Sequence, residues 1–403
     1  MSEPHKPRPK SESMDLNDAF AVQPKGTATP TKGSSSLVRA AERESAKEEE
    51  PPTTAKTAPA ENSRRARGGA SAEGIDEVER AGVKDPAPRE LFADLSDLGG
   101  PDALLAKRPA EFGWQGAVNK ATFGLLKLKP SADELVRRRG IERIQSSIAR
   151  PMTILLANAA GGAGKTITAV GLAGTFGIHR GGEVVVWDNN ETQGSLSLRT
   201  KPQGSNRTVL DLLSAMDDPE SMSLGDVSPF LRRQGNARFE VLASSTDPVA
   251  MTQIKREQFN RVHRVLTRFK QLVVIDSGNN CLAENFVAAA DTADLLVIPT
   301  GLQRADVQRA LWTLQTLHEA GYERLVENAV VVISEGTRGK ESAAAAKEFR
   351  EALSKKLDII DVPYDPHLDR GTVVDMELLA DKTRRAYENL AALITHKLSK
   401  LDS

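Results

Sequence analysis

The chain is poor in cysteine, in aromatic residues and in long apolar runs. Its one cysteine, Cys281, excludes a disulfide framework, a zinc site built from cysteines and an iron–sulfur cluster held by several thiolates of one chain. No apolar run reaches the length of about 18 residues that a membrane-spanning helix needs, and residues 1–10 lack the apolar core of a signal peptide. A lone thiol also fits a reducing compartment, so we expect a soluble, cytoplasmic protein.

Net charge is almost absent as well. The 54 Lys and Arg residues nearly balance 55 Asp and Glu residues, which excludes a wholly basic nucleic-acid coat and a wholly acidic solvating protein. Hydrophobic residues make up 39% and aromatic residues 4%, both low for one globular body of this length. Since the shortage is uneven along the chain, we expect an unfolded part joined to a folded part.

The shortage falls on residues 1–85, which hold one aromatic residue, Phe20, and stretches rich in Pro, Thr, Ser, Ala and Gly. Such a composition buries too little apolar surface to offset the entropy lost on ordering. We predict a disordered tail. A passive linker is the favoured interpretation, and an arm that binds a partner or is phosphorylated is the alternative.

Residues 86–150 are predicted to form a short helical, basic region before the main domain. Leu91, Phe92 and Leu95 suggest helical turns, and Ser131 with Glu134 resembles a capping box. Residues 120–150 carry eight basic and three acidic residues, including the triplet Arg137–Arg139. The favoured interpretation is a helix that docks by its inner face, with a phosphate-contacting patch for DNA or an anionic-membrane patch as alternatives.

Residues 151–403 alternate between apolar runs and helical segments. Strands are predicted at 153–157, 184–187, 239–243, 272–275, 295–299, 330–333 and 359–362. Alternation with continuous apolar strands predicts an α/β fold, a parallel sheet sandwiched by helices on both faces.

The strongest local signal is the sequence Ala-Asn-Ala-Ala-Gly-Gly-Ala-Gly-Lys-Thr at 157–166. It follows the first predicted strand and precedes a helix predicted over 167–178. Glycines let successive amides point at phosphate oxygens, and the helix N-terminus adds positive potential. Lys165 would sit between the β- and γ-phosphates, and the Thr166 hydroxyl would ligate Mg²⁺.

This segment resembles the deviant Walker A box of the MinD/ParA family of P-loop ATPases, whose pattern is K-G-G-x-G-K-T/S. Gly161, Gly162, Gly164, Lys165 and Thr166 match that pattern, and Ala160 stands where the family has its signature lysine. The resemblance covers residues 151–401 and implies ATP and Mg²⁺ as cofactors, a homodimer, and a nucleotide-binding loop that includes Ala163 and Ile167. Without the signature lysine, the contact that it makes across the family's dimer is not expected.

Two further strand ends carry acids. The run ending in Asp188 and continuing through Glu191 is similar to the family's switch I, and the run ending in Asp276 is similar to a Walker B strand. The resemblance implies Lys165, Glu191 and Asp188 as catalytic residues, Glu191 orienting the attacking water, and Thr166, Asp276 and Asp188 around the metal. The alternative for switch I is an acidic turn that caps a helix. Cys281 is expected to be a buried small hydrophobe.

Near the end of the chain, Pro363, Tyr364 and Asp365 resemble the family's I-P-x-D loop near the adenine. A weaker resemblance upstream, at 113–115 and 124–131, is to actinobacterial MinD-like proteins, some of them at type VII secretion loci. The last helix has an apolar face but few lysines and no Trp or Phe. Docking on the core is therefore favoured over contact with a membrane.

We expect an ATP-hydrolysing switch of the MinD/ParA type that positions or regulates a macromolecular cargo, either a partition complex for chromosomes or plasmids or a secretion apparatus. The alternative is a regulatory module that binds nucleotide with little hydrolysis, because Ala160 replaces the lysine. A small-molecule ligase or kinase is disfavoured, since no second constellation of polar residues marks a substrate pocket. An unidentified protein partner is expected, and Arg384, Arg385 and Arg137–Arg139 are candidates for nonspecific DNA contact.

Overall fold

The computed structural model describes residues 105–190, 194–202, 206–245, 247–252, 254–335, 350–351, 353–354 and 356–401, and every structural statement below concerns these residues. They belong to one compact unit. The predicted tail at 1–85, the first part of the predicted basic region and Glu191 lie outside the described residues.

The described part is an α/β structure built on one sheet, as predicted. The strands run in the order β3-β4-β2-β5-β1-β6-β7-β8, and all neighbours are parallel except β3 and β4. All seven predicted strands are present. The strand bounds are β1 Met152–Leu156, β2 Val184–Asn189, β3 Arg232–Arg233, β4 Glu240–Leu242, β5 Leu272–Ser277, β6 Leu295–Thr300, β7 Val330–Ser334 and β8 Asp358–Val362.

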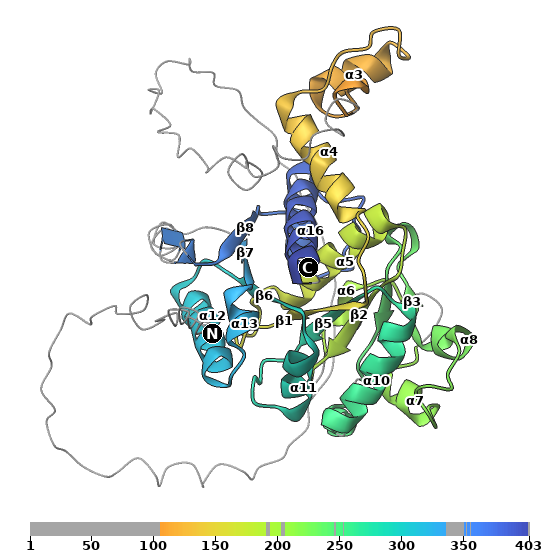
Figure 1. Cartoon of the computed structure of the whole chain (residues 1–403), viewed down its shortest axis with the longest axis vertical. Helices are drawn as coiled ribbons and strands as arrows, with labels where there is room; N and C mark the ends of the chain where they lie inside the picture. Colours follow the sequence, from red (N-terminus) through yellow and green to blue (C-terminus); the bar gives the residue numbers. More distant parts are fainter. Residues whose placement is uncertain are drawn as a thin grey trace, which may run out of the picture. The chain divides into compact units, whose positions relative to one another are not determined.

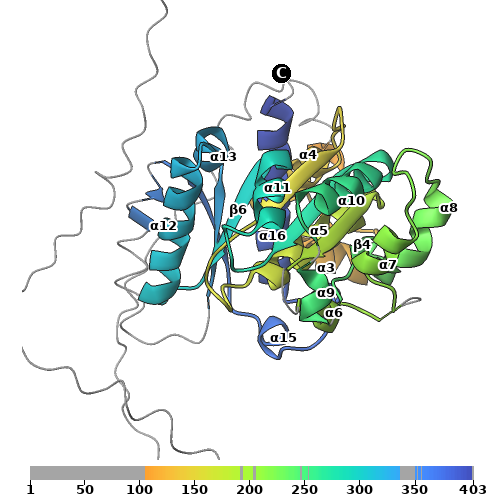
Figure 2. The ribbon, with the colours of Figure 1, turned by 90° about the horizontal axis from the view of Figure 1, so that it is seen from below.

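Helices cover both faces of this sheet. Figure 1 shows α4, α5 and α16 on one side and α10, α11 and α12 on the other, and in Figure 2 the second group faces the viewer. The helix bounds are α3 Gly113–Ala121, α4 Ala132–Ile144, α5 Lys165–Arg180, α6 Leu196–Arg199, α7 Val209–Ser214, α8 Leu224–Val227, α9 Pro248–Met251, α10 Arg256–Phe269, α11 Glu284–Thr292, α12 Arg304–Glu319, α13 Glu323–Glu327, α15 Pro366–Asp369 and α16 Asp381–Leu401.

The core is divided by the sheet into two apolar clusters. Successive residues of a strand point to opposite faces, so Leu155 joins the cluster under α10 to α12 while Ile154 and Leu156 join the cluster under α5 and α16. Strands β1, β2, β5 and β6 are buried along their whole length. This double burial explains why their sequences are continuous apolar runs without alternation.

The last helix, α16, packs into the body of the protein. Leu390, Leu393, Ile394 and Leu398 are buried in the cluster that α16 shares with α5. The predicted docking of this helix on the core is therefore confirmed. No helix among the described residues is both apolar enough and long enough to span a bilayer.

The arginine triplet in α4 is largely used inside the protein. Arg137 forms an ion pair with Glu388 of α16 at 2.6 Å, and Arg138, with 7% of its side chain exposed, binds Glu134 at 2.6 Å. These pairs confirm that α4 docks by its inner face. They contradict the alternative in which the whole triplet forms an open patch for phosphates.

The capping box predicted at the start of α4 is only half formed. The Ser131 hydroxyl accepts a hydrogen bond from the Glu134 amide at 3.1 Å. The Glu134 carboxylate does not return to Ser131, because it accepts bonds from the Glu111 amide at 2.8 Å and from Arg138. The acid that would close the box instead ties α4 to the segment before α3.

Candidate functional site

Loops that follow the parallel strands meet at the carboxyl edge of the sheet, where ligands bind in open α/β folds. The loop at 157–164 joins β1 to α5, and it contains two residues in the left-handed region, Gly162 at φ +77° and Gly164 at φ +87°. Gly164 is also the N-cap of α5. A residue with a Cβ would be strained at both positions. The curled loop and the N-terminus of a 16-residue helix together form a place for an anion.

The beginning of this loop is fixed by two side chains, those of Asn158 and Thr313, whose roles the motif does not reveal. The Asn158 side chain accepts a hydrogen bond at Oδ1 from the backbone amide of Ala160 at 2.8 Å, and its Nδ2 donates to the Pro299 carbonyl at 2.8 Å. The Thr313 hydroxyl of α12 accepts from the Ala159 amide at 3.1 Å. The loop is thereby held against β6 and α12 before any ligand is considered.

Lys165 turns its ammonium back into the curl of the loop. Its Nζ donates to the Asn158 carbonyl at 2.7 Å, the Ala160 carbonyl at 3.1 Å and the Asn279 Oδ1 at 2.6 Å. Only 8% of the residue is exposed. A positive charge is therefore held inside the loop that precedes α5, as binding of a polyphosphate requires.

Thr166 and Asp276, which are both expected around the metal, lie in direct contact. The Thr166 hydroxyl donates to the Asp276 Oδ2 at 2.7 Å and lies 2.8 Å from the Ser195 hydroxyl. Because the single proton of Thr166 is given to Asp276, Ser195 must be the donor in its own bond to Thr166. The other oxygen of Asp276, Oδ1, is buried and has no hydrogen-bond partner in the described structure.

Asp188 lies beside Asp276, because the two residues are register partners on β2 and β5. Burial raises the pKa of Asp276 to about 7, with a further contribution from the charge of Asp188. Burial likewise raises the pKa of Asp188 to about 6, against hydrogen bonds from Ser244 and the amides of Asn190 and Leu196. Two neighbouring buried carboxyl groups repel each other when both are ionised. A divalent cation between them would reduce this repulsion.

The segment after β2 is closely fitted to Asp188. A Cβ on Gly194 would lie 1.9 Å from the Asp188 Oδ2, and the Ser244 hydroxyl donates to the same oxygen at 2.9 Å. The glycine of the predicted switch I segment is therefore required by packing against the acid. The structure places Asp188 at the site, whereas Glu191 lies outside the described residues.

The remaining predicted nucleotide contacts surround the same loop. Ala163 is buried, and Ile167 packs against the α5 cluster. A Cβ on Gly161 would lie 3.7 Å from the Asn279 amide nitrogen, and one on Gly164 would lie 3.5 Å from the Ser334 hydroxyl at the end of β7. The end of β7 therefore borders the phosphate loop.

The loop that contains Pro363, Tyr364 and Asp365 follows β8, next to the end of β7. Asp365 accepts hydrogen bonds from the amides of His367 and Ala380, both at 2.9 Å. Burial works to raise the pKa of Asp365, but these bonds outweigh it and the pKa is lowered. The Tyr364 hydroxyl donates to Asp369 at 3.1 Å. Asp365 thus fixes the shape of the loop through contacts within the chain.

These residues fit a magnesium-bound polyphosphate. Among the described residues no group of three His, Cys, Asp or Glu side chains could hold a metal ion by itself. The site instead offers one hydroxyl and two carboxyl groups beside an anion cradle, and Mg²⁺ commonly combines one or two carboxylates with ligand phosphates and water. The unpartnered Asp276 Oδ1 is available to such a hydrated ion. Cys281 is buried in the cluster under α10 to α12, as predicted, and has no place in this chemistry.

Comparison with known proteins gives similarities both by sequence and by fold. No family model matches the chain. The ESX-1 secretion-associated protein EspI of Mycobacterium tuberculosis (strain H37Rv) is 24% identical over 286 residues, which is 70% of this chain and 42% of EspI. The chain therefore spans less than half the length of this curated relative.

Among solved structures, the ParA family ATPase from Chlorobium tepidum TLS matches with a TM-score of 0.51 and 14% identity, over 60% of this chain and 98% of that one. The septum site-determining protein MinD of Pyrococcus horikoshii OT3, solved with Mg-ADP, has a TM-score of 0.46 and 18% identity, over 60% and 94% of the two chains. The described part of the chain therefore has the fold of the ParA family ATPase from Chlorobium tepidum.

Proposed function

We propose that this chain binds and hydrolyses ATP with Mg²⁺ and acts as a molecular switch. One observation carries the proposal: Lys165, Thr166 and the Asp188–Asp276 pair lie together at a loop that contains two left-handed glycines and precedes the N-terminus of α5. The fold shared with the ParA-family ATPase supports it. A bound magnesium ion would neutralise charge on the phosphates and between the two aspartates.

In this proposal each side chain has a defined task. Residues Gly161 to Thr166 hold the phosphates, with Lys165 leaving its loop carbonyls for phosphate oxygens. Asp276, Asp188 and Thr166 surround the metal, and Glu191 orients water. Ile167, Pro363, Tyr364 and Asp365 border the base and the adjoining part of the nucleotide.

The bond between Ser195 and Thr166 provides the link to switching. If the Thr166 hydroxyl turns from Asp276 toward a ligand, Ser195, which donates to that hydroxyl, must change its own contact. Ser195 follows Gly194, which packs on Asp188. The segment after β2 would therefore adopt different structures with and without nucleotide, as a switch requires.

Calorimetry with Mg-ATP tests the binding. The wild type should bind, and Lys165→Ala should weaken binding by at least about 100-fold, because a charge-assisted contact to phosphate is lost. The matched control is Lys382→Ala on exposed α16 surface, which should bind normally. Failure of the wild type to bind, or equal binding by Lys165→Ala, would refute the proposed site.

A second candidate function is a nucleotide-dependent regulator with little turnover. It is favoured by Ala160, which occupies the position of the family's signature lysine and is fully buried. Phosphate release separates the two functions. Turnover that Lys165→Ala abolishes supports the switch, whereas ATP binding and ATP-dependent dimerisation without phosphate release support the regulator.

For the cargo we propose a secretion apparatus rather than a partition complex, on the similarity to EspI, which is named as ESX-1 secretion-associated. Affinity purification from the native cells, with wild type and Lys165→Ala as baits, tests this. We expect secretion components to be enriched by the wild type alone. Enrichment of centromere-binding proteins instead would contradict the assignment.

A further inference from the structure

The α3 hairpin, residues 112–130, displays large apolar side chains that no described residue covers. Trp114 is 68% exposed, Phe123 96%, Leu125 88% and Leu126 51%. Figure 1 shows α3 and the turn after it standing away from the sheet and its helices, joined to them through α4. Exposed apolar groups that gather on one projecting element mark an interaction site more often than scattered ones do.

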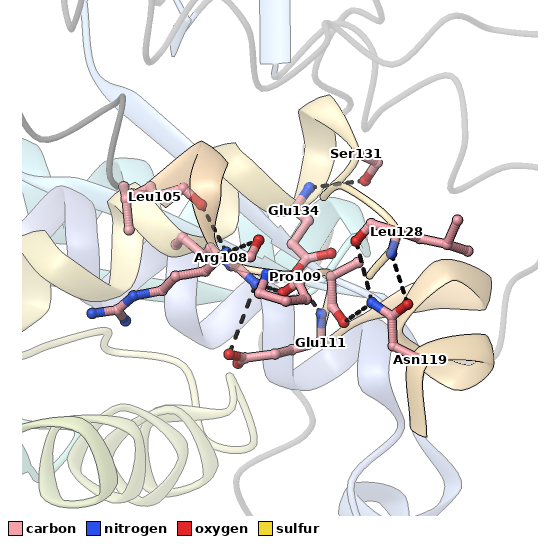
Figure 3. A network of polar contacts seen from close by, with 10 residues as sticks. Leu105, Arg108, Pro109, Glu111, Asn119, Leu128, Ser131 and Glu134 are labelled. Carbon is pink, nitrogen blue, oxygen red and sulfur yellow. Dashed lines mark hydrogen bonds and ion pairs between the residues drawn. The ribbon is translucent and has the colours of Figure 1, made fainter. Parts of the chain in front are cut away.

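A buried polar network holds the base of the hairpin rigid. The Asn119 side chain donates to the Ala110 carbonyl at 2.9 Å and accepts from the Leu128 amide at 2.9 Å, which joins the two arms (Figure 3). Arg138 donates to the carbonyls of Leu105 and Pro109 at 2.8 and 2.7 Å. The apolar tip is therefore presented on a fixed support.

The tip itself has a defined turn that keeps Phe123 outward. Phe123 has φ +49°, an uncommon value for an aromatic residue. Its amide donates to the Lys120 carbonyl at 3.1 Å, and the Gly124 amide donates to the Asn119 carbonyl at 2.8 Å. These two bonds form the Schellman motif that ends α3, in which the residue after the C-cap takes the left-handed conformation, and they fix the backbone of the turn at Phe123.

The charge around this tip has one sign. Lys120, Lys127 and Lys129 are all exposed, and residues 112–130 contain no Asp or Glu. An apolar apex with lysines on its shoulders is complementary to a surface that is apolar inside and anionic outside. A second copy of the same hairpin would instead bring like charges together.

We propose that the α3 hairpin is a docking element for membranes that contain anionic lipids. Phe123, Leu125 and Leu126 enter the boundary between headgroups and acyl chains, Trp114 lies at headgroup level, and the three lysines contact lipid phosphates. The shape favours a membrane over a partner helix, because the described tip is a projecting turn rather than a groove. The last helix plays no part, since its apolar face is buried.

Sedimentation of the full chain with vesicles tests this proposal without nucleotide. We expect binding to vesicles of phosphatidylcholine with phosphatidylglycerol, weak binding to phosphatidylcholine alone, and release at high salt. The double variant Phe123→Asn/Leu125→Ser should bind at least about tenfold less. Asn tolerates a positive φ, so this variant should keep its fold, which an unchanged thermal midpoint would verify.

The matched control is Leu224→Ser/Val249→Ser, which removes two exposed apolar side chains elsewhere and should bind as the wild type does. Of the three tryptophans, Trp114 and Trp312 are exposed and Trp187 is buried. In a Trp312→Phe background, Trp114 is therefore the one exposed tryptophan, and its fluorescence emission should shift to the blue when anionic vesicles are added. No sedimentation, equal loss in the control, or retention of binding by the Phe123→Asn/Leu125→Ser variant would overturn the proposal. So would retention on DNA, or a change of oligomeric state, in the absence of vesicle binding.

Discussion

At the scale of single residues, the neighbouring carboxyl groups of Asp188 and Asp276 make the stability of the fold depend on pH. The pKa values of Asp188 and Asp276 are raised to about 6 and about 7, above that of an unfolded aspartate. Between about pH 4 and pH 7 the folded state therefore binds more protons than the unfolded state. Without nucleotide, the contribution of these groups to stability should fall as the pH rises through that range.

Asp276→Asn removes one charge of the pair and keeps an oxygen for Thr166. We predict that this variant is more stable than the wild type without ligand at about pH 8, with a thermal midpoint about 2–4 °C higher for each kcal/mol gained. The gain should shrink as the pH is lowered toward about 4. Thermal unfolding across this pH range is the measurement, with the exposed Asp217→Asn as control. A variant less stable than the wild type at pH 8 would show that the carboxyl pair is not repulsive.

The same substitution separates stability from function. The amide oxygen that Asp276→Asn introduces is neutral and would be a weaker ligand for the hydrated ion than a carboxylate oxygen. Magnesium-dependent affinity for ATP should therefore fall in this variant while its stability without ligand rises.

Gly162, Gly164, Thr166 and Asp276 could be predicted as site residues from the sequence. The phosphate loop must lie between a strand and a helix, and the acid must end a later apolar strand. Motif spacing did not reveal Asn279 or Ser195, whose contacts with Lys165 and Thr166 arise between loops. A small polar residue in a turn is common for many reasons. Only the folded arrangement distinguishes the ones that contact the site.

At the scale of elements, the parallel strands were predictable because burial on both faces demands continuous apolar runs. The missed strand, β3, has two residues, Arg232 and Arg233, and pairs only with β4. An edge strand of that length has no apolar pattern to recognise. The half-formed capping box failed for a related reason, since the partners of Glu134 lie outside the local motif.

The contact between α4 and α16 depends on an ion pair whose side chains are each only 10% exposed. Burial works to raise the pKa of Glu388, but contacts with His179 and Arg137 outweigh it and the pKa is lowered. A lowered carboxyl pKa contributes stability that is present above the unfolded value and lost as the pH falls through the folded value. This contribution is therefore complete at neutral pH and disappears in acid.

Arg137→Ala should cost about 3 kcal/mol at pH 7, because it leaves Glu388 buried and without its main partner. The cost should be smaller at an acidic pH below the lowered pKa of Glu388, where the carboxyl group is protonated. Urea unfolding at both pH values measures this, with Arg385→Ala on the exposed side of α16 as the control. In a double-mutant cycle, Arg137→Ala should cost much less stability when Glu388 is already replaced by Gln. If the free-energy changes of the two single variants simply added up in the double variant, a direct interaction between Arg137 and Glu388 would be contradicted.

At the scale of the whole molecule, the sequence suggests a boundary near residue 150, between a helical region and the P-loop domain. Packing supports a different unit. Ile144 at the end of α4 is fully buried in the cluster formed with α5 and α16, and Arg180 of α5 donates to the Ile144 carbonyl at 2.7 Å. A boundary predicted from composition lies where the charge and the apolar pattern of the sequence change. Cooperative unfolding depends instead on which elements share one hydrophobic core.

We therefore predict that residues 105–403 unfold as one cooperative unit and that a fragment of residues 151–403 is much less stable. The shorter fragment loses the Ile144 side chain, which as Ile144→Ala should cost about 2–5 kcal/mol, and leaves Glu388 without Arg137. Urea unfolding of the two fragments and the full chain is the measurement. The fragment beginning at residue 105 is the control and should match the full chain, because the network around Asn119 and Arg138 is intact in it. Equal stability of all three would place the domain border at 150 and make α4 an accessory.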